Sequence, residues 1–173
     1  MGAGKDMFAD YLIEKYDFQK LKLGHDIRNN VDKYCNSLNI PQEERRKLYV
    51  TYAEICRVIF GTDLWSSVTY DSIKNPNNNH IIADGRQWHE YDYWVYKNEF
   101  IPVGIKANVE LRKERLISRD GVDQSNQFNN MTERQINNII EKIKNENGIV
   151  IENNGTIVQL KNQIDSMMRY LCR

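Results

Sequence analysis

The sequence has few cysteines and no excess of charge of either sign. Its three cysteines, Cys35, Cys56 and Cys172, are widely spaced and form no Cys-x-x-Cys pair, which argues against a zinc site or a disulfide framework. The 24 basic and 24 acidic side chains cancel, so net charge gives no reason to expect nucleic acid or an acidic membrane as a partner. We expect a cytoplasmic protein with reduced thiols and with neither kind of partner.

Long apolar runs are also missing. No stretch of the 173 residues is apolar enough to cross a bilayer, and the amino-terminal residues lack the apolar segment of a signal peptide. Neither a linker nor an internal repeat divides the sequence. A single domain over residues 1–173 is therefore expected, large enough to bury a core.

Short apolar runs alternate instead with amphipathic segments. Helical spacing predicts helices over residues 6–15, 25–38, 42–60, 86–98, 108–119, 132–145 and 156–171. Apolar runs bounded by turn residues predict strands over 18–23, 80–83, 99–107 and 148–152. This alternation predicts an α/β domain with a mostly parallel sheet. The polar stretch 120–131 has no periodicity and is expected to be a mobile surface loop.

The first stretch with a chemical signal is the opening, MGAGKDMFADYL. Gly2 and Gly4 have no Cβ, so backbone N–H groups there can approach a phosphate closely. Lys5 would add a positive charge, and the following helix the positive end of its dipole. Asp6 occupies the place where a Ser or Thr usually meets Mg²⁺. Taken alone, the stretch is better explained as a flexible amino terminus ahead of a helix, because short motifs often mislead.

A second stretch, IIADGRQWHEYDYW, places Asp84 and Arg86 directly after an apolar strand. Ligands of open parallel sheets bind at that edge, where an aspartate can hold a metal or orient a substrate. An arginine there can grip a phosphate through its planar guanidinium. Taken as a bare string, Asp-Gly-Arg is better explained as a plain turn with a solvated arginine.

The helix around LRKERLISRDG carries Arg112, Arg115 and Arg119 at steps of three and four, on one face. The simplest interpretation is a solvated charged stripe. Because the stripe leads into the 120–131 loop, it also fits a mobile lid that brings cations to a transferring phosphoryl group.

Near the carboxyl end, Asn153, Asn154 and Gly155 follow the last strand. Such a loop could lie against a nucleotide base. It is equally well explained as a turn that precedes a helix capped by Thr156.

Together these stretches resemble the phage-type deoxynucleoside monophosphate kinases, a branch of the P-loop kinases related to adenylate kinase. The resemblance covers nearly the whole chain in order, through GAGKDMFADYL, LKLGHDIRNNV, VIFGTDLW, ADGRQWHE and VIENNGTIVQLKNQI. The most specific match is ADGRQWHE, which resembles the Asp-x-Arg-Gln-x-His-Glu strand end of that family.

The resemblance implies a three-layer α/β/α P-loop kinase fold with a five-stranded parallel sheet. Substrate-side helices would cover about residues 24–75, and a lid about 112–134. The implied activity is ATP-dependent phosphorylation of a deoxynucleoside monophosphate to the diphosphate, with ATP and Mg²⁺ required. Nucleotides would be the partners, and the chain could form a homodimer.

Site roles follow from the same resemblance. Gly2, Ala3, Gly4 and Lys5 would bind the ATP phosphates, with Asp6 close to Mg²⁺, and Asn153, Asn154 and Gly155 would lie near the adenine. Arg28, Asp84 and Arg86 would face the acceptor monophosphate, while Arg115 and Arg119 would belong to the lid. Lys5, Arg115, Arg119 and Asp84 would carry the catalysis.

Two features depart from the family pattern. Met7 stands where the family usually has Thr. The central strand and first glycine that precede the loop in the family have no counterpart ahead of Gly2, so we expect a gap in the sheet and hypothesise a longer natural product. The alternatives are a dephospho-coenzyme-A-kinase-like enzyme, an inactive truncated remnant, or a nucleic-acid-binding module on Tyr93, Trp94 and Tyr96.

Overall fold

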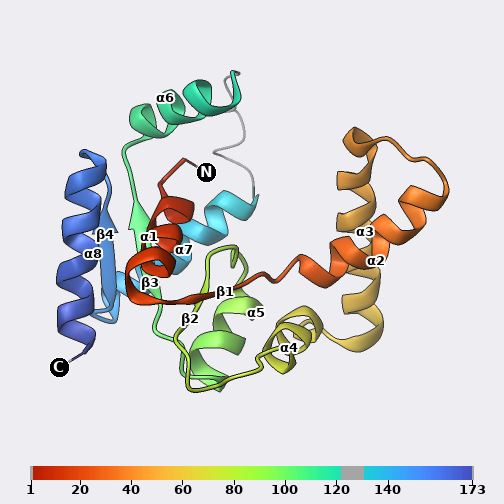
Figure 1. Cartoon of the computed structure of the whole chain (residues 1–173), viewed down its shortest axis with the longest axis horizontal. Helices are drawn as coiled ribbons and strands as arrows, with labels where there is room; N and C mark the ends of the chain where they lie inside the picture. Colours follow the sequence, from red (N-terminus) through yellow and green to blue (C-terminus); the bar gives the residue numbers. More distant parts are fainter. Residues whose placement is uncertain (1, 122–130, 173) are drawn as a thin grey trace.

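The computed structural model describes residues 2–121 and 131–172. Its elements are, in chain order, α1 (Lys5–Tyr16), β1 (Gln19–Leu21), α2 (His25–Ser37), α3 (Gln42–Phe60), α4 (Leu64–Asp71), β2 (His80–Ile82), α5 (Trp88–Tyr91), the π-helix η1 (Asp92–Lys97), β3 (Val103–Lys106), α6 (Val109–Asp120), α7 (Met131–Asn145), β4 (Ile149–Glu152) and α8 (Ile157–Leu171) (Figure 1). Helices alternate with parallel strands, which is an α/β arrangement. Most of the expected 120–131 loop and the middle of the expected lid lie outside the described residues.

Each helix and strand predicted from sequence has a counterpart, with three differences. The sequence analysis did not predict α4. The segment expected to be one helix over 86–98 is a short α-helix that continues as η1. The strands are short, at three or four residues each.

The described strands form two separate parallel pairs rather than one sheet. Strand β1 pairs with β2, and β3 pairs with β4. The expectation of five strands in a single sheet is therefore not met within the described residues, where four strands are present. In this described part, no hydrogen-bonded ladder joins β2 to β3.

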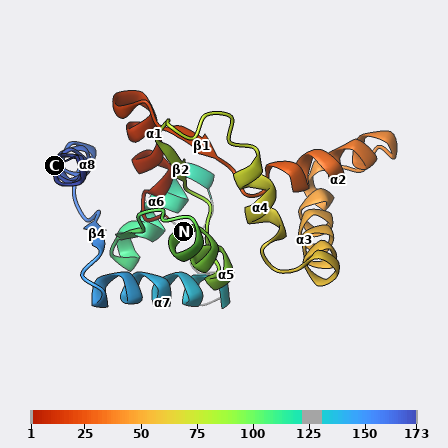
Figure 2. The same ribbon diagram turned by 90° about the horizontal axis from the view of Figure 1, so that it is seen from below.

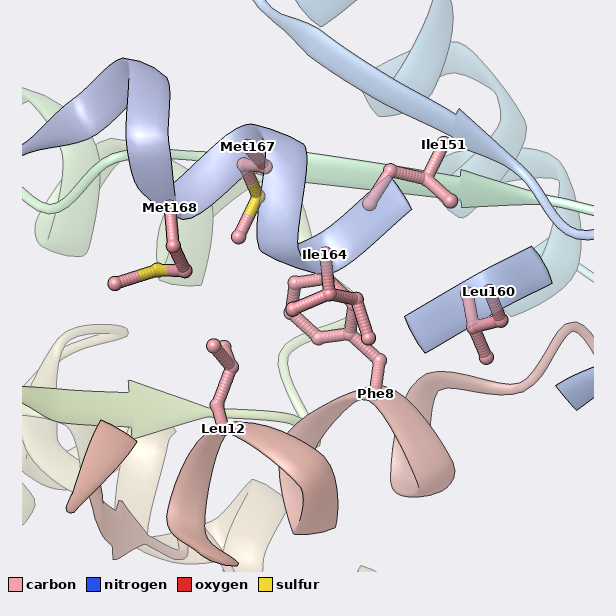
Figure 3. Packing of buried hydrophobic residues seen from close by; sticks show 7 residues of the cluster. All are labelled: Phe8, Leu12, Ile151, Leu160, Ile164, Met167 and Met168. Carbon is pink, nitrogen blue, oxygen red and sulfur yellow. The ribbon is translucent and has the colours of Figure 1, made fainter. Parts of the chain in front are cut away.

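One apolar cluster nevertheless connects both pairs. Phe8 and Leu12 of α1 meet Ile164 of α8, which is fully buried (Figure 3). The partly buried Ile81 of β2 and Ile105 of β3 pack against the same cluster. Each such side chain contributes about 1.5–3 kcal/mol when fully buried. Helix α1 thus holds the two strand pairs together from one face.

Helix α7 covers the other face of β3 and β4, so that α7 and α8 lie on opposite sides of β4 (Figure 2). Gly104 explains the close approach of α7 to β3. A Cβ at this position would lie 3.0 Å from Cγ2 of Ile140. The glycine therefore allows α7 to pack closely on β3.

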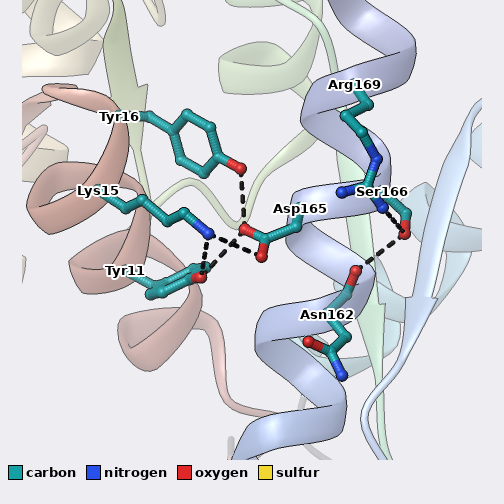
Figure 4. A network of polar contacts seen from close by, with 7 residues as sticks. All are labelled: Tyr11, Lys15, Tyr16, Asn162, Asp165, Ser166 and Arg169. Atoms are coloured by element: carbon teal, nitrogen blue, oxygen red, sulfur yellow. Dashed lines mark hydrogen bonds and ion pairs between the residues drawn. The ribbon is translucent and has the colours of Figure 1, made fainter.

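A polar network fastens α1 to α8 at the edge of the core (Figure 4). One carboxylate oxygen of Asp165 accepts hydrogen bonds from the hydroxyls of Tyr11 (3.0 Å) and Tyr16 (2.8 Å). Its other oxygen accepts from Lys15 at 2.8 Å. The hydrogen bond from Lys15 and those from the two tyrosines lower the pKa of Asp165 against a smaller opposing effect of burial.

Helices α2, α3 and α4 stand to one side of the strands (Figures 1 and 2). They have a small core of their own, in which Ile27, Ala53, Cys56 and Trp65 are buried. The indole N–H of Trp65 donates to the carbonyl oxygen of Ala53 at 3.2 Å. In the described part of the chain, no helix has the length and apolar character needed to cross a membrane.

Candidate functional site

The loop ahead of α1 has the backbone conformation that its glycines permit. Gly2 and Gly4 have φ angles of +73° and +98°, which side-chain-bearing residues rarely adopt. Helix α1 begins at Lys5, immediately after Gly4. The backbone N–H groups of the first turn of a helix have no partner within the helix, so this end of α1 suits an anion.

Contacts from two other elements leave no room for side chains at these glycines. A Cβ on Gly4 would lie 2.2 Å from Nδ2 of Asn153, and a Cβ on Gly2 would lie 2.7 Å from the carbonyl oxygen of Arg112. The side-chain amide of Asn153 donates a hydrogen bond to the carbonyl oxygen of Ala3 at 3.0 Å. The loop is therefore held by the turn after β4 and by the start of α6.

Lys5 and Asp6 form a pair at the start of α1. The Lys5 ammonium donates to a carboxylate oxygen of Asp6 at 2.7 Å, and both side chains are exposed. Burial acts to raise the pKa of the Asp6 carboxyl. The hydrogen bond from Lys5 and the charges of Lys20 and Arg119 together outweigh this effect, so the pKa lies below its usual value. Asp6 is thus held ionised, as a magnesium ligand must be.

The three arginines of α6 have different surroundings, so the interpretation of a uniform solvated stripe is wrong. Arg112 forms a buried ion pair with Glu133 of α7. Nη2 of Arg115 lies 3.5 Å from the carbonyl oxygen of Gly155, and its Nη1 is buried without a hydrogen-bond partner among the described residues. Arg119 is exposed and close enough to Asp6 to lower the pKa of that carboxyl.

The turn after β4 has both predicted features, a turn and a capped helix. Thr156 caps α8, since its hydroxyl accepts from the backbone N–H of Gln159 and Gln159 bonds back to the N–H of Thr156. Asn154 accepts a hydrogen bond from the N–H of Asn108 at 2.7 Å. Beside the turn lies an open hollow of about 390 Å³, lined by Glu152, Asn154, Gly155, Gln159, Asn162 and Gln163.

Two of the acceptor-side residues, Asp84 and Arg86, follow β2, and the third, Arg28, lies on α2. Asp84 follows β2, and its carboxylate lies 3.4 Å from the backbone nitrogen of Leu23, which follows β1. Arg86 and Arg28 are exposed, and neither guanidinium makes a hydrogen bond or ion pair among the described residues. No hydrogen bond or ion pair joins these three side chains to the Gly2–Gly4 loop in the part of the chain that the structure describes.

The site residues thus form two groups. The Gly2–Gly4 loop, Arg115 and the Asn153–Gly155 turn lie together at the ends of β3 and β4, and Lys5, Asp6 and Arg119 lie close to this loop. Asp84 and Arg86 instead follow β2, and Arg28 lies on α2. No family model matches the chain, and no curated protein matches it in sequence. The functional argument therefore depends on the geometry of this site.

Sequence reasoning did not predict two contacts that shape the site. Glu133, which holds Arg112, is almost fully buried although it lies in a polar stretch. Asn153 was expected beside a base, but its side chain is buried against Ala3. The signal for Glu133 is an acidic residue in the first turn of a helix that follows the arginine-bearing segment. The sequence holds no signal for the Asn153 contact.

Proposed function

We propose that the chain transfers the γ-phosphoryl group of ATP to a deoxynucleoside monophosphate, on a three-layer P-loop kinase fold. One observation carries the proposal. Gly4 has a left-handed backbone conformation, its missing Cβ leaves room for Asn153, and the 12-residue helix α1 begins at the next residue. A glycine loop that leads into a helix amino terminus is a phosphate-binding arrangement.

On the donor side, the N–H groups at the start of α1 bind phosphate oxygens of ATP, and Lys5 leaves Asp6 to contact the β- and γ-phosphates. Asp6 is the residue that would hold Mg²⁺, because this ion is usually bound by one or two carboxylates together with phosphates and water. When bound, Mg²⁺ would supply positive charge beside the phosphates. The adenine would occupy the hollow beside Asn154 and Gly155.

On the acceptor side, Arg86 and Arg28 bind the monophosphate and Asp84 orients it. An acceptor phosphate oxygen attacks the γ-phosphorus of ATP, the bond from that phosphorus to the β-bridging oxygen breaks, and ADP leaves with those electrons. The protein supplies alignment and charge neutralisation, the latter from Lys5, Arg115 and Arg119. Such a reaction belongs in the cytoplasm, where ATP is available.

The test is a coupled assay of ADP release with each of the four deoxynucleoside monophosphates. Lys5→Ala is expected to lower kcat by at least about 100-fold, with little change in thermal unfolding. Lys74→Ala is the matched control, since Lys74 is an exposed lysine far along the chain from the loop. Normal turnover by the Lys5→Ala protein would overturn the proposal.

A second variant separates the two sides of the site. Arg86→Gln is expected to raise KM for the monophosphate about tenfold or more while KM for ATP stays near that of the wild type. A panel that extends to dephospho-coenzyme A distinguishes the related kinase class. No ADP release with any acceptor, together with no thermal shift on adding ATP and Mg²⁺, would favour the inactive remnant.

A further inference from the structure

The segment that joins β2 to α5 has little backbone bonding of its own. Residues 83–87 belong to no helix or strand, and no backbone–backbone hydrogen bond involves residues 84–86 in the described part of the chain. At the start of the segment, the carboxylate of Asp84 lies 3.4 Å from the backbone nitrogen of Leu23. The conformation around Arg86 is therefore fixed by side chains.

The side chain of Glu90 fixes the other end of the segment. One of its carboxylate oxygens accepts hydrogen bonds from the backbone N–H groups of Arg86, at 2.6 Å, and of Gln87, at 3.0 Å. Hydrogen bonds to an ionised carboxylate are roughly twice as strong as those between neutral groups. Because the two donors are consecutive and share one oxygen, the peptide between them is held in one orientation relative to α5.

Helix α5 gives this carboxylate a fixed base. Glu90 is the third residue of α5, and the next residue, Tyr91, is buried. The ring of Tyr91 packs edge-on against Trp88, with ring centroids 6.0 Å apart, and against Tyr96 of η1 at 5.7 Å. Such edge-to-face pairs add to the stabilisation that burial gives. The carboxylate is therefore carried by a packed element.

The guanidinium of Arg86 is not neutralised by this nearby carboxylate. Arg86 is exposed, and its guanidinium makes no hydrogen bond or ion pair among the described residues. A planar guanidinium commonly forms paired bonds with a carboxylate, but here the hydrogen bonds of Glu90 are with the backbone. The positive charge of Arg86 thus stays available to an anion while its backbone is held in place.

We propose that Glu90 is a positioning residue for Arg86, which raises the affinity for the phosphate group of the acceptor without touching that group. The inference rests on the proposed function, in which Arg86 binds the acceptor monophosphate. A segment that must be ordered when a ligand binds lowers the affinity, so a segment that is already ordered binds more tightly. Residues that hold a ligand-contacting side chain in place therefore contribute to binding through it.

The charge of Glu90 makes the sign of the effect informative. A carboxylate beside a phosphate-binding arginine repels the phosphate, so loss of this charge alone would strengthen binding. Binding would also become stronger if the carboxylate merely occupied N–H groups that a phosphate could take. Loss of positioning has the opposite effect, because Arg86 would then have to be ordered each time a phosphate binds. Weaker binding after removal of the Glu90 carboxylate therefore identifies positioning.

The test titrates inorganic phosphate, and then each of the four deoxynucleoside monophosphates, into the full chain and follows the side-chain Nε–H signal of Arg86 by NMR. Glu90→Ala is expected to weaken binding of these anions about tenfold. Glu90→Gln keeps an oxygen that can accept from Arg86 and Gln87, and should recover most of the affinity. Asp92→Ala removes an exposed acidic side chain two residues further along the chain and should leave binding unchanged or slightly stronger.

Amide exchange tests the contact itself and needs no nucleotide. In the Glu90→Ala protein, exchange at the amides of Arg86 and Gln87 should be at least about tenfold faster than in the wild type. The amide of Phe100, which donates to the carbonyl of Trp94 at 2.9 Å, is the internal reference for an intact η1 and should not change.

Phosphate binding by Glu90→Ala that equals or exceeds that of the wild type would overturn the proposal. Unchanged exchange at Arg86 would do the same, as would a wild-type Arg86 signal that does not respond to phosphate. The kinase reaction fails separately. A wild-type protein that binds phosphate at Arg86 but releases no ADP would refute phosphoryl transfer and leave the role of Glu90 standing.

Discussion

The side-chain amide of Asn153 donates a hydrogen bond to the carbonyl oxygen of Ala3 at 3.0 Å, although the two residues are 150 positions apart in the sequence. Asn153 is buried, and its own backbone N–H donates to the carbonyl of Lys106. One residue thus joins the end of β3, the turn after β4 and the loop ahead of α1. The conformation of the proposed phosphate loop depends on this turn.

Truncation of this side chain should therefore loosen the loop. Asn153→Ala leaves the Ala3 carbonyl without its donor, and we expect the free energy of unfolding in urea to fall by about 1–3 kcal/mol. Asn162→Ala on the exposed face of α8 is the control, with an expected change within about 0.5 kcal/mol. Equal stability of the two variants would contradict the role assigned to Asn153.

The glycine at the start of α1 should tolerate no side chain. Gly4→Ala combines a left-handed backbone with a contact to Asn153, and is expected to cost at least about 1–3 kcal/mol of unfolding free energy. Gly24→Ala is the matched control, because φ there is −92° and no atom lies within 4 Å of the added Cβ. Chemical denaturation of both variants checks the difference, and a Gly4→Ala protein as stable as Gly24→Ala would refute it.

The Asp165 network should make part of the stability depend on pH. Because its partners lower the pKa of Asp165, the carboxylate stabilises the fold fully above the ordinary aspartate pKa of about 3.9. This stabilisation is lost as the pH falls through the lowered pKa. Asp165→Asn should thus lower the melting temperature by a constant amount between pH 7 and 5, and the difference should shrink in stronger acid.

The measurement is a series of thermal melts from pH 7 to pH 3. Asp10→Asn is the control, since the one ion pair of Asp10 with a described residue is a long, exposed contact with Lys20. A difference between wild type and Asp165→Asn that persists unchanged at pH 3 would show that the charge of Asp165 is not what stabilises α1 against α8.

The ion pair between Arg112 and Glu133 should matter far more than ion pairs on the surface. Glu133→Ala removes a buried carboxylate and leaves the partly buried Arg112 guanidinium, 12 % exposed, without this partner, and is expected to cost about 3–5 kcal/mol in unfolding free energy. Glu141→Ala removes the exposed partner of Lys106 and should change stability little. Urea denaturation compares them; a small loss for Glu133→Ala would mean that other contacts hold Arg112.

Apolar periodicity was sufficient to predict most helices and strands, because it reports which residues face a core. Helices such as α2, with Ile27 and Val31 buried four residues apart, follow directly from it. The contacts that build the site are different. Asn153 with Ala3 and Arg112 with Glu133 join polar residues far apart in sequence, and polar spacing does not reveal which of them meet.

The strands show a second limit. Local pattern predicted each of them but could not fix their pairing, which depends on hydrogen bonds between distant segments. The resemblance to P-loop kinases supplied the expectation of a middle strand, and the structure has two pairs with a break between them. The pattern did not predict α4 because its eight residues span only two turns of helix.

The position of α1 under both strand pairs has a consequence for cooperativity. A two-stranded sheet is marginally stable by itself, and here each pair depends on apolar contacts that converge on Phe8 and Leu12. Those two side chains therefore decide whether the molecule melts in a single all-or-none transition or in two successive ones.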